Sequence, residues 1–234
     1  MNFTLSAGNS PLAMSQLVTG VKYKYYINQL RFYIGYPRLI RADSTEVPLS
    51  NLFIVAYDLL NPHNSIYGTN FNFQIPSGNY IGIKFGIGVP PAISDTVKHY
   101  HYTGANDPLN GNYGMIWPGD PTVIRDIAID MQADTSVAQN QPANRDYQFH
   151  ILNDHNQDSV HLYKDMFFAD AFNISNAGNH TVTFNLDYNK IFFNASSPID
   201  LRQVSGTDMF NNDLNGLSLG EQINKNFYSS LTKQ

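Results

Sequence analysis

The sequence has no cysteine, and this excludes both disulfide bonds and thiolate metal sites. Charged residues make up only 14% of the chain, the net charge is −5 and no Lys/Arg cluster occurs, so the basic surface typical of nucleic-acid binding is missing. No apolar run approaches the roughly 18–20 residues that cross a bilayer, and we expect no transmembrane segment. No signal peptide is visible, which leaves a cytosolic protein or an exported one whose leader is not present in this chain.

What the sequence does contain indicates a folded β protein. Hydrophobic residues make up 42% of the 234 residues, too many for a disordered chain. The aromatic residues are 15 Tyr, 15 Phe and a single Trp, so the core should be large and aromatic. This length is ordinary for one all-β domain, and we expect residues 1–234 to form a single domain.

Apolar residues that alternate with polar ones dominate residues 21–34. This period of two is typical of a β-strand, because successive side chains point to opposite faces of the sheet. The apolar positions are Tyr23, Tyr25, Ile27, Leu30, Phe32 and Ile34. Arg31 and Tyr33 should face the other way, and Gly35-Tyr36-Pro37 should end or bend the strand.

Many further short segments have strand character and are separated by turn residues such as Pro118-Gly119-Asp120-Pro121. They are Leu39–Ala42, Leu52–Asp58, Asn70–Ile75, Tyr80–Val89, Val123–Gln132, Asp146–Leu152, Ser159–Tyr163, Ala169–Ile174 and His180–Leu186. This pattern predicts an all-β fold, an antiparallel two-layer β-sandwich with long loops at Pro90–Met115 and Ala133–Arg145. An apolar residue at every fourth position predicts one C-terminal helix over Ser218–Leu231.

The same spacing predicts which side chains form the core. The residues expected to be mostly buried are Tyr25, Ile27, Leu30, Phe32, Ile83, Phe85, Ile87, Phe149, Phe184 and Leu186.

No sequence signature of an enzyme is present. The chain lacks a nucleophile elbow, a Walker loop, a zincin helix and a catalytic cysteine. Its glycine-rich stretch at residues 82–88 lies inside a strand pattern rather than before a helix, so it does not resemble a phosphate-binding loop. We therefore expect no catalytic residues and a protein that is not an enzyme.

Histidines are the most suggestive candidates for chemistry. His99 and His101 form a His-x-His pair, which on a strand would point two imidazoles, ligands for Cu, Zn or Ni, to one side. His150 should face away from Tyr147, Phe149 and Ile151 on the same strand. Each histidine could instead be a structural or solvent-exposed surface residue. The single tryptophan, Trp117, could instead anchor the core or its rim.

Five segments, in this order along nearly the whole chain, resemble the MbnP-like family, which is named for a periplasmic copper protein associated with methanobactin. They are Tyr25–Ile34, Ile75–Val89, Asp107–Leu109 followed by Gly114–Trp117, Phe149–Ile151, and Asn226-Phe227 near the end. The resemblance implies a compact β-rich protein that is exported to the periplasm or the cell surface, commonly as a bacterial lipoprotein. It also implies a di-haem peroxidase-like partner and an outer-membrane protein complex.

The resemblance further implies copper held by two histidines beside a kynurenine that the partner makes from tryptophan. Trp117 matches the motif tryptophan, and His150 matches a motif histidine. The histidine expected two residues after the tryptophan is missing, because position 119 is glycine, so His99 or His101 would have to replace it. Met115 could add a soft thioether ligand.

Two other functions stay open. The chain could be a metal-free family member that serves as a surface or complex-forming module and binds protein partners through its long loops and exposed aromatics. It could also be an enzyme whose motif is not recognisable.

Overall fold

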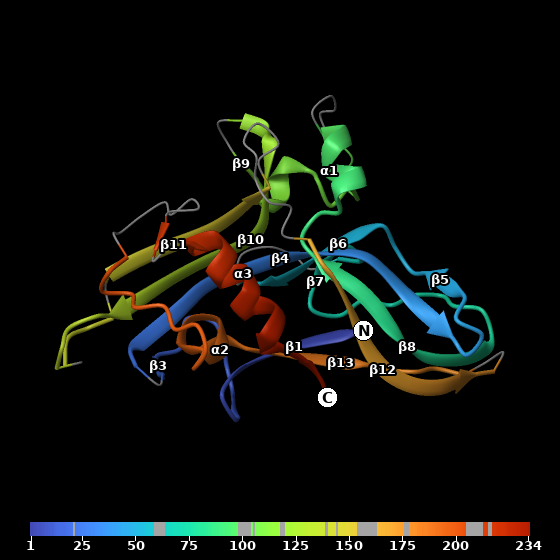
Figure 1. Ribbon diagram of the computed structural model, residues 1–234, viewed down its shortest axis with the longest axis horizontal. Coiled ribbons are helices and arrows are strands. Elements are labelled where there is room, and N and C mark those ends of the chain that lie inside the picture. The colour runs from blue at the N-terminus through green and yellow to red at the C-terminus, as the bar shows by residue number, and fades with distance from the viewer. Residues whose placement is uncertain are drawn as a thin grey trace.

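The computed structural model describes residues 1–20, 22–58, 64–97, 104, 106–117, 120–138, 140–143, 145–153, 163–175, 178–204, 213–214 and 217–234. In this part of the chain about half of the residues belong to strands, nearly all of them in two facing layers (Figure 1). One layer is a large sheet, and the other consists of a small sheet and two helices. The predicted β-sandwich is confirmed, although both sheets are mixed rather than purely antiparallel.

Strand β4 (Lys24–Arg41) is the long axis of the large sheet. Its first half pairs with β10 (Asp120–Asp134) and its second half with β8 (Gly78–Ile87), so β8 and β10 diverge near residue 34. Its other edge pairs with β6 (Leu52–Tyr57), β5 (Glu46–Pro48) and β3 (Val18–Thr19). The sheet is completed by β11 (Arg145–Asn153), β12 (Asp165–Ile174), β7 (Tyr67–Gly68) and β9 (Ile116–Trp117).

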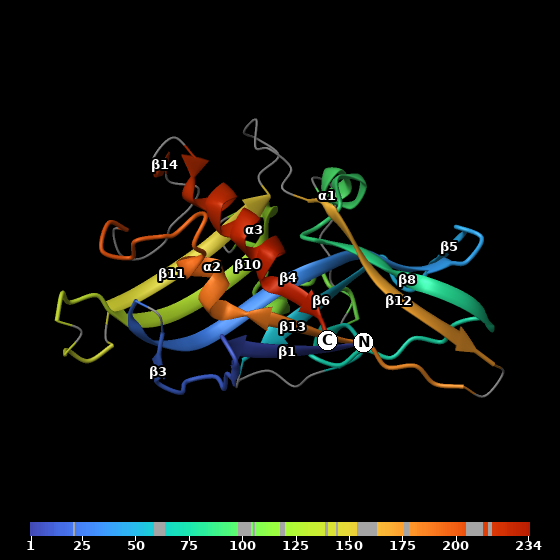
Figure 2. The ribbon, with the colours of Figure 1, turned by 60° about the horizontal axis from the view of Figure 1, so that its bottom comes forward.

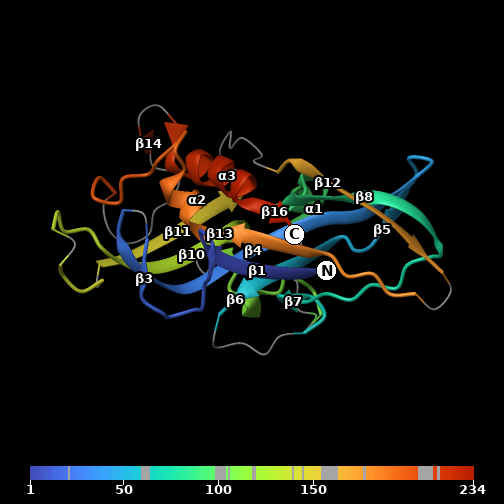
Figure 3. The same ribbon diagram turned by 90° about the horizontal axis from the view of Figure 1, so that it is seen from below.

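The small sheet has the order β16–β13–β1–β2. Its strands are β1 (Asn2–Ala7), β2 (Ser10–Pro11), β13 (Thr183–Asp187) and β16 (Leu231–Lys233). The central pair, β1 and β13, is parallel, and β16 brings the C-terminus beside the N-terminus (Figure 3). A separate two-stranded ladder joins β14 (Asp213–Leu214) to β15 (Leu217–Ser218).

Helices α2 (Tyr188–Phe193) and α3 (Leu219–Ser230) extend the second layer over the half of the large sheet that contains β10 and β11 (Figure 2). The buried face of α3 carries Leu219, Ile223 and Phe227, as its four-residue spacing predicts, and Phe227 meets Phe32 edge-on at 4.9 Å between ring centroids. The predicted C-terminal helix is therefore confirmed. The sequence did not predict α2, α1 (Pro91–Val97) or the 3₁₀ turn η1 (Gly111–Tyr113).

The main core lies between the two layers and is strongly aromatic. All ten residues predicted to be buried are at most 2% exposed, which confirms the predicted strand faces. The inward-facing positions change from odd to even residue numbers between Ile27 and Leu30, because the pairing with β10 shifts by one residue at Asn28. The extra residue of this bulge changes the face on which the following side chains lie, so Leu30 and Phe32 point inward as Tyr25 and Ile27 do.

Three predicted elements differ in the structure. Residues 71–75 are not a strand, and Asn70 makes only an isolated bridge to Asn2. The segment Gly35-Tyr36-Pro37 does not end β4 but forms an irregularity in its pairing with β8, with Tyr36 at a φ of +45°. Of the predicted strand Ser159–Tyr163, only Tyr163 lies within the described residues, and it is not in a strand.

None of the described helices is long and apolar enough to cross a membrane.

Candidate functional site

A second, smaller core lies on the outer face of the large sheet, away from the small sheet. It forms where the described parts of residues 88–117 lie over β4, β6 and β10, and α1 and β9 stand together on this side (Figure 1). Its buried members are Tyr33, Leu52, Ile54, Ala56, Tyr67, Val89, Leu109, Met115, Ile124 and Ala128. We call this region the outer cluster. It contains Met115, and Ile116, the neighbour of Trp117, packs against it.

Arg31 attaches the covering segment to the sheet. Its Nε donates to Asp58 Oδ2 at 2.8 Å, and its Nη1 donates to the carbonyl oxygen of Tyr113 at 2.8 Å. The Tyr67 hydroxyl also donates to Asp58, and the Tyr67 ring stacks on Tyr113 at 5.0 Å between centroids. The Arg31 and Asp58 side chains are only 8% and 3% exposed. Removing each charge from water costs free energy, and the ion pair between them offsets part of that cost.

Gly114 allows this close approach. It has a φ of +67°, and a Cβ atom there would lie 2.6 Å from Arg31 Nη1. Arg125 fixes the same turn from β10, since its Nη1 donates to the Gly114 carbonyl at 2.9 Å and its backbone N–H donates to Met115 O at 2.8 Å. Two arginines therefore hold the backbone that leads into Met115 and β9.

The start of the covering segment is fixed where β8 and β10 diverge. Asp126 Oδ1 accepts the Val89 N–H at 2.8 Å, and Gly88, with a φ of +96°, leaves room for that carboxylate. The hydroxyl of Tyr33 donates to the Pro108 carbonyl at 3.0 Å. Burial raises the pKa of Tyr33 well above its ordinary value, and the nearby Asp126 and Asp107 carboxylates add to the shift.

His150 lies on β11, on the same outer face. It pairs across the sheet with Ala128 of the outer cluster, whereas its neighbours Phe149 and Ile151 belong to the main core, as predicted. The residue is 4% exposed, and its Nε2 is 3.5 Å from Asp130 Oδ1. A buried imidazole beside a carboxylate suits either a metal ligand or a polar core contact.

Met115 and His150 share this face but are not at the same level of β10. Met115 is fully buried, and its carbonyl oxygen accepts from Arg125. Ile116 pairs with Ile124, and His150 pairs with Ala128 four residues further along. Four residues of extended strand span about 13 Å. Ile124 of β10 pairs with β9 on one side and with β11 on the other. Met115, which precedes β9, and His150, which lies on β11, therefore approach β10 from opposite sides.

The backbone of Trp117 ends β9 opposite Asp120, but its side chain lies outside the described atoms. His99 and His101 also lie outside the described residues. The chain on either side of them belongs to the outer cluster region: Ile93 of α1 packs on the cluster, and the Gly104 carbonyl accepts from the Asn110 side chain at 3.0 Å. Tyr33 OH binds the Pro108 carbonyl in the same loop.

The donor chemistry at this face suits copper, because imidazole and thioether are both ligands that copper accepts. Within the described residues no group of three or more His, Cys, Asp or Glu side chains is arranged to hold a metal. A copper site built on His150 or Met115 would therefore take further ligands from the segment that carries His99 and His101.

Sequence reasoning missed the residues that build this region. Arg31 was expected on the face opposite Leu30 and Phe32, but its burial was not predicted, and Asp58 was assigned no role. The only signal for either is a charged residue inside or beside a strongly apolar strand, and nothing local in the sequence shows that residues 113–115 cover it.

Comparison with known proteins was made at the level of sequence and of structure. The sequence matches the MbnP family over residues 1–211. No curated protein matches the chain. Among solved structures, the fold is similar to that of MbnP from Methylosinus trichosporium, with a TM-score of 0.52 over 93% of this chain and 81% of that one, at 11% sequence identity.

Proposed function

Because the chain belongs to the MbnP family, we propose that it is an exported, non-catalytic protein of the periplasm or the cell surface that binds and handles copper. The observation that carries the proposal is the position of the family motifs. Met115, the backbone of Trp117 and His150 all lie on or beside the outer cluster, and the described chain on both sides of His99 and His101 lies there too.

In this proposal one or both of His99 and His101 bind copper beside Trp117. The further ligand is either the His150 imidazole or the Met115 thioether, because these two residues approach β10 from opposite sides, about 13 Å apart along the strand. Two neutral imidazoles favour Cu(I) in a two- or three-coordinate site. The clamp of Arg31 and Arg125 on residues 113–115 would hold the Met115 side of the site while the ion enters or leaves. Their role would be positioning, since guanidinium groups do not bind metal.

Copper titration of the full chain in competition with a Cu(I) chelator tests the proposal. We expect about one copper ion per chain, with binding lost in the double variant His99→Ala/His101→Ala and weakened in either His150→Ala or Met115→Leu. His180→Ala is the matched control, because His180 lies outside the outer cluster and is held by Asp170. A wild-type protein that binds no copper, or equal binding by all variants, would contradict the proposal.

The pH dependence of copper affinity provides an independent measurement. Imidazole binds copper only when it is neutral, so affinity should fall as the pH drops below the ordinary histidine pKa of about 6.5. An affinity that is constant from pH 8 to pH 5 would point away from histidine ligands.

The proposed partner is a di-haem peroxidase-like enzyme within an outer-membrane protein complex, and its product would be a modified Trp117. Oxidation of tryptophan to kynurenine adds about 4 Da, so mass spectrometry of protein from its native host should find this increase on the peptide that contains Trp117. If the peptide from a host that makes the partner were unmodified, the proposed oxidation of Trp117 would be wrong. The proposed copper binding would not be affected by this result.

A metal-free module that binds protein partners is the second candidate. Phe167 of β12 is 53% exposed and lies over Gly82 of β8, and exposed aromatic residues are enriched at protein interfaces. Wild-type protein that binds no copper yet associates with its outer-membrane complex would favour this candidate.

A further inference from the structure

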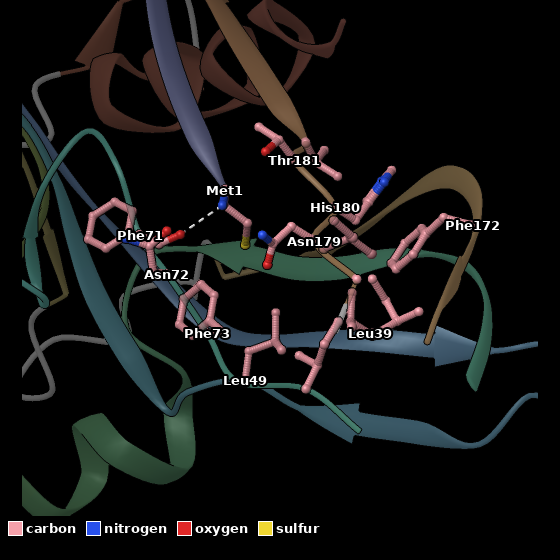
Figure 4. A pocket seen from close by; sticks show the side chains of 15 residues that line it. Met1, Leu39, Leu49, Phe71, Asn72, Phe73, Phe172, Asn179, His180 and Thr181 are labelled. Atoms are coloured by element: carbon pink, nitrogen blue, oxygen red, sulfur yellow. Dashed lines mark hydrogen bonds between the residues drawn. The ribbon is translucent and has the colours of Figure 1, made fainter. Parts of the chain in front are cut away.

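A cavity of about 490 Å³ opens between the two layers, at the end of the molecule away from β10 and β11 (Figure 4). It exists because the layers differ in length. Strand β4 has 18 residues, whereas β1 and β13 have six and five, so the small sheet does not cover the inner face of β4 and β8 around Leu39 and Ile83. A pocket of this size lies within the usual range of small-molecule sites.

The walls of the cavity are apolar and come from several elements. Leu39 and Ile83 form its floor and are 3% and 2% exposed. Residues 71–75, predicted to be a strand, instead run along one wall, where Phe71, Phe73 and Ile75 line the cavity. Phe71 also packs in the main core, 4.0 Å from Phe53 between ring centroids, whereas Phe73 and Ile75 are only partly buried. Such a wall favours an apolar ligand, because water in the cavity gains little from these side chains.

The opposite wall is held rigidly by a stack of rings. His180 lies flat on Phe172 at 3.9 Å between centroids, and Phe172 stacks on Tyr80 at 5.1 Å. His180 Nε2 lies 2.7 Å from Asp170 Oδ2, and Lys233 Nζ lies 2.9 Å from Asp170 Oδ1. This arrangement fixes the ring of His180 and already satisfies its neighbouring charges, so the wall has no unbalanced charge to offer a ligand.

The rim of the cavity is polar and includes the N-terminal ammonium of Met1, which donates to the Phe71 carbonyl at 2.7 Å. Asn72, Asn179 and Thr181 are exposed there, and Figure 4 shows Asn179 pointing into the space between Phe73 and Phe172. Amide and hydroxyl groups can donate or accept hydrogen bonds to one polar end of a molecule whose remainder lies against Leu39, Leu49 and Ile83.

From this geometry we infer a second binding site, distinct from the outer cluster, for a small, mainly apolar molecule that has one hydrogen-bonding end. The proposal is independent of copper, because the cavity lies on the inner face of the large sheet and shares no residue with the outer cluster. Its test likewise uses metal-free protein.

Two fluorescent probes that share their rings and differ in charge test the inference on the full chain. N-phenyl-1-naphthylamine is neutral, whereas 1-anilinonaphthalene-8-sulfonate carries a sulfonate. We expect saturable binding of the neutral probe, because the floor and one wall of the cavity are apolar. The sulfonate probe shows whether the Met1 ammonium at the rim also favours a charged end. Absence of saturable binding of either probe would contradict the inference.

Filling the cavity should abolish this binding. Leu49→Trp places an indole in the space and should weaken the neutral probe by about tenfold or more. Leu17→Trp is the matched control, since Leu17 is 47% exposed and does not line the cavity, and it should leave the affinity unchanged. Thermal unfolding of both variants shows whether either has lost its fold.

Asn179→Trp gives a second test at an exposed rim position, where the fold does not depend on the side chain. It should also weaken the neutral probe. Absence of saturable binding to the wild type, or an affinity unchanged by both Leu49→Trp and Asn179→Trp, would overturn the inference.

Discussion

The two faces of the large sheet are stabilised in different ways. The inner face packs on the small sheet and on α2 and α3 almost entirely through apolar contacts, many of them between aromatic rings such as Phe85, Phe168 and Phe184. The outer cluster instead combines a few apolar residues with buried charges, among them Arg31, Asp58 and Asp126. Apolar packing tolerates repacking, whereas buried charges require particular partners. The outer face is therefore the one whose arrangement is narrowly specified, and it is the face on which Met115 and His150 lie.

The largest effect should come from a cavity in the inner core. Phe85 is fully buried and lies 5.2 Å from Phe168 and 5.1 Å from Phe184 between ring centroids. Phe85→Ala should lower the free energy of unfolding by roughly 3–5 kcal/mol, measured by urea denaturation. The same substitution at Phe167, which is 53% exposed, is the control and should cost less than about 1 kcal/mol. A loss below about 1 kcal/mol for Phe85→Ala would mean that the inner core is not the main source of stability.

A somewhat smaller loss should follow from breaking the buried ion pair of the outer cluster. Arg31→Met should cost about 3 kcal/mol, at the low end for a buried pair because Tyr67 still donates to Asp58. Arg38→Met on the same strand is the control. The partners of Arg38, Glu46 and Asp165, are 47% and 34% exposed, so its loss should stay below about 1 kcal/mol.

The double variant Arg31→Met/Asp58→Leu sharpens this comparison. Removing both charges should restore part of the stability, because no buried charge is left without its partner. If Arg31→Met alone proved as mild as Arg38→Met, the clamp would not contribute to the fold of the outer cluster.

A smaller effect should distinguish the buried tyrosines of the two faces. Tyr33→Phe removes the hydrogen bond to the Pro108 carbonyl and should cost about 1 kcal/mol at pH 7. Tyr188→Phe should cost less, since its hydroxyl donates only to the sulfur of Met131, a weak acceptor.

Both substitutions should also change the response to alkali. Burial raises the pKa of Tyr33 and of Tyr188 well above the ordinary value, so their contribution to stability is fully present below about pH 10. It is lost as the pH rises further, because the unfolded chain then releases protons that the folded protein retains. Each Phe variant should therefore lose less stability than the wild type between pH 9 and pH 11, and an identical loss would contradict the assigned burial.

The sequence predicted the inner face well and the outer face poorly, for a physical reason. Alternation at Leu30, Phe32 and Ile34 identifies the side of β4 that faces the second layer, since period-two patterns record burial on one face. Arg31 lies on the opposite face, as the alternation predicts, but its burial was not predicted. Its burial depends on residues 113–115, which lie more than 80 positions away, and no local pattern reports a contact over that distance.

The candidate site was predictable only through the resemblance. The position of His150 on the outer face followed from its strand, and its burial did not. Residues 71–75 show the converse error. Phe71, Phe73 and Ile75 alternate as a strand would, but the wall of a cavity produces the same alternation as a paired strand.

X-ray absorption spectroscopy of the copper-loaded protein tests the central claim most directly, namely that the outer face holds copper through histidine, with either His150 or Met115 as a ligand. The chain has no cysteine, so any sulfur bound to copper must belong to a methionine. We predict nitrogen ligands near about 2.0 Å, with either one sulfur near about 2.3 Å that is lost in Met115→Leu or one nitrogen that is lost in His150→Ala. Spectra that neither variant changes would place the copper elsewhere and contradict the claim.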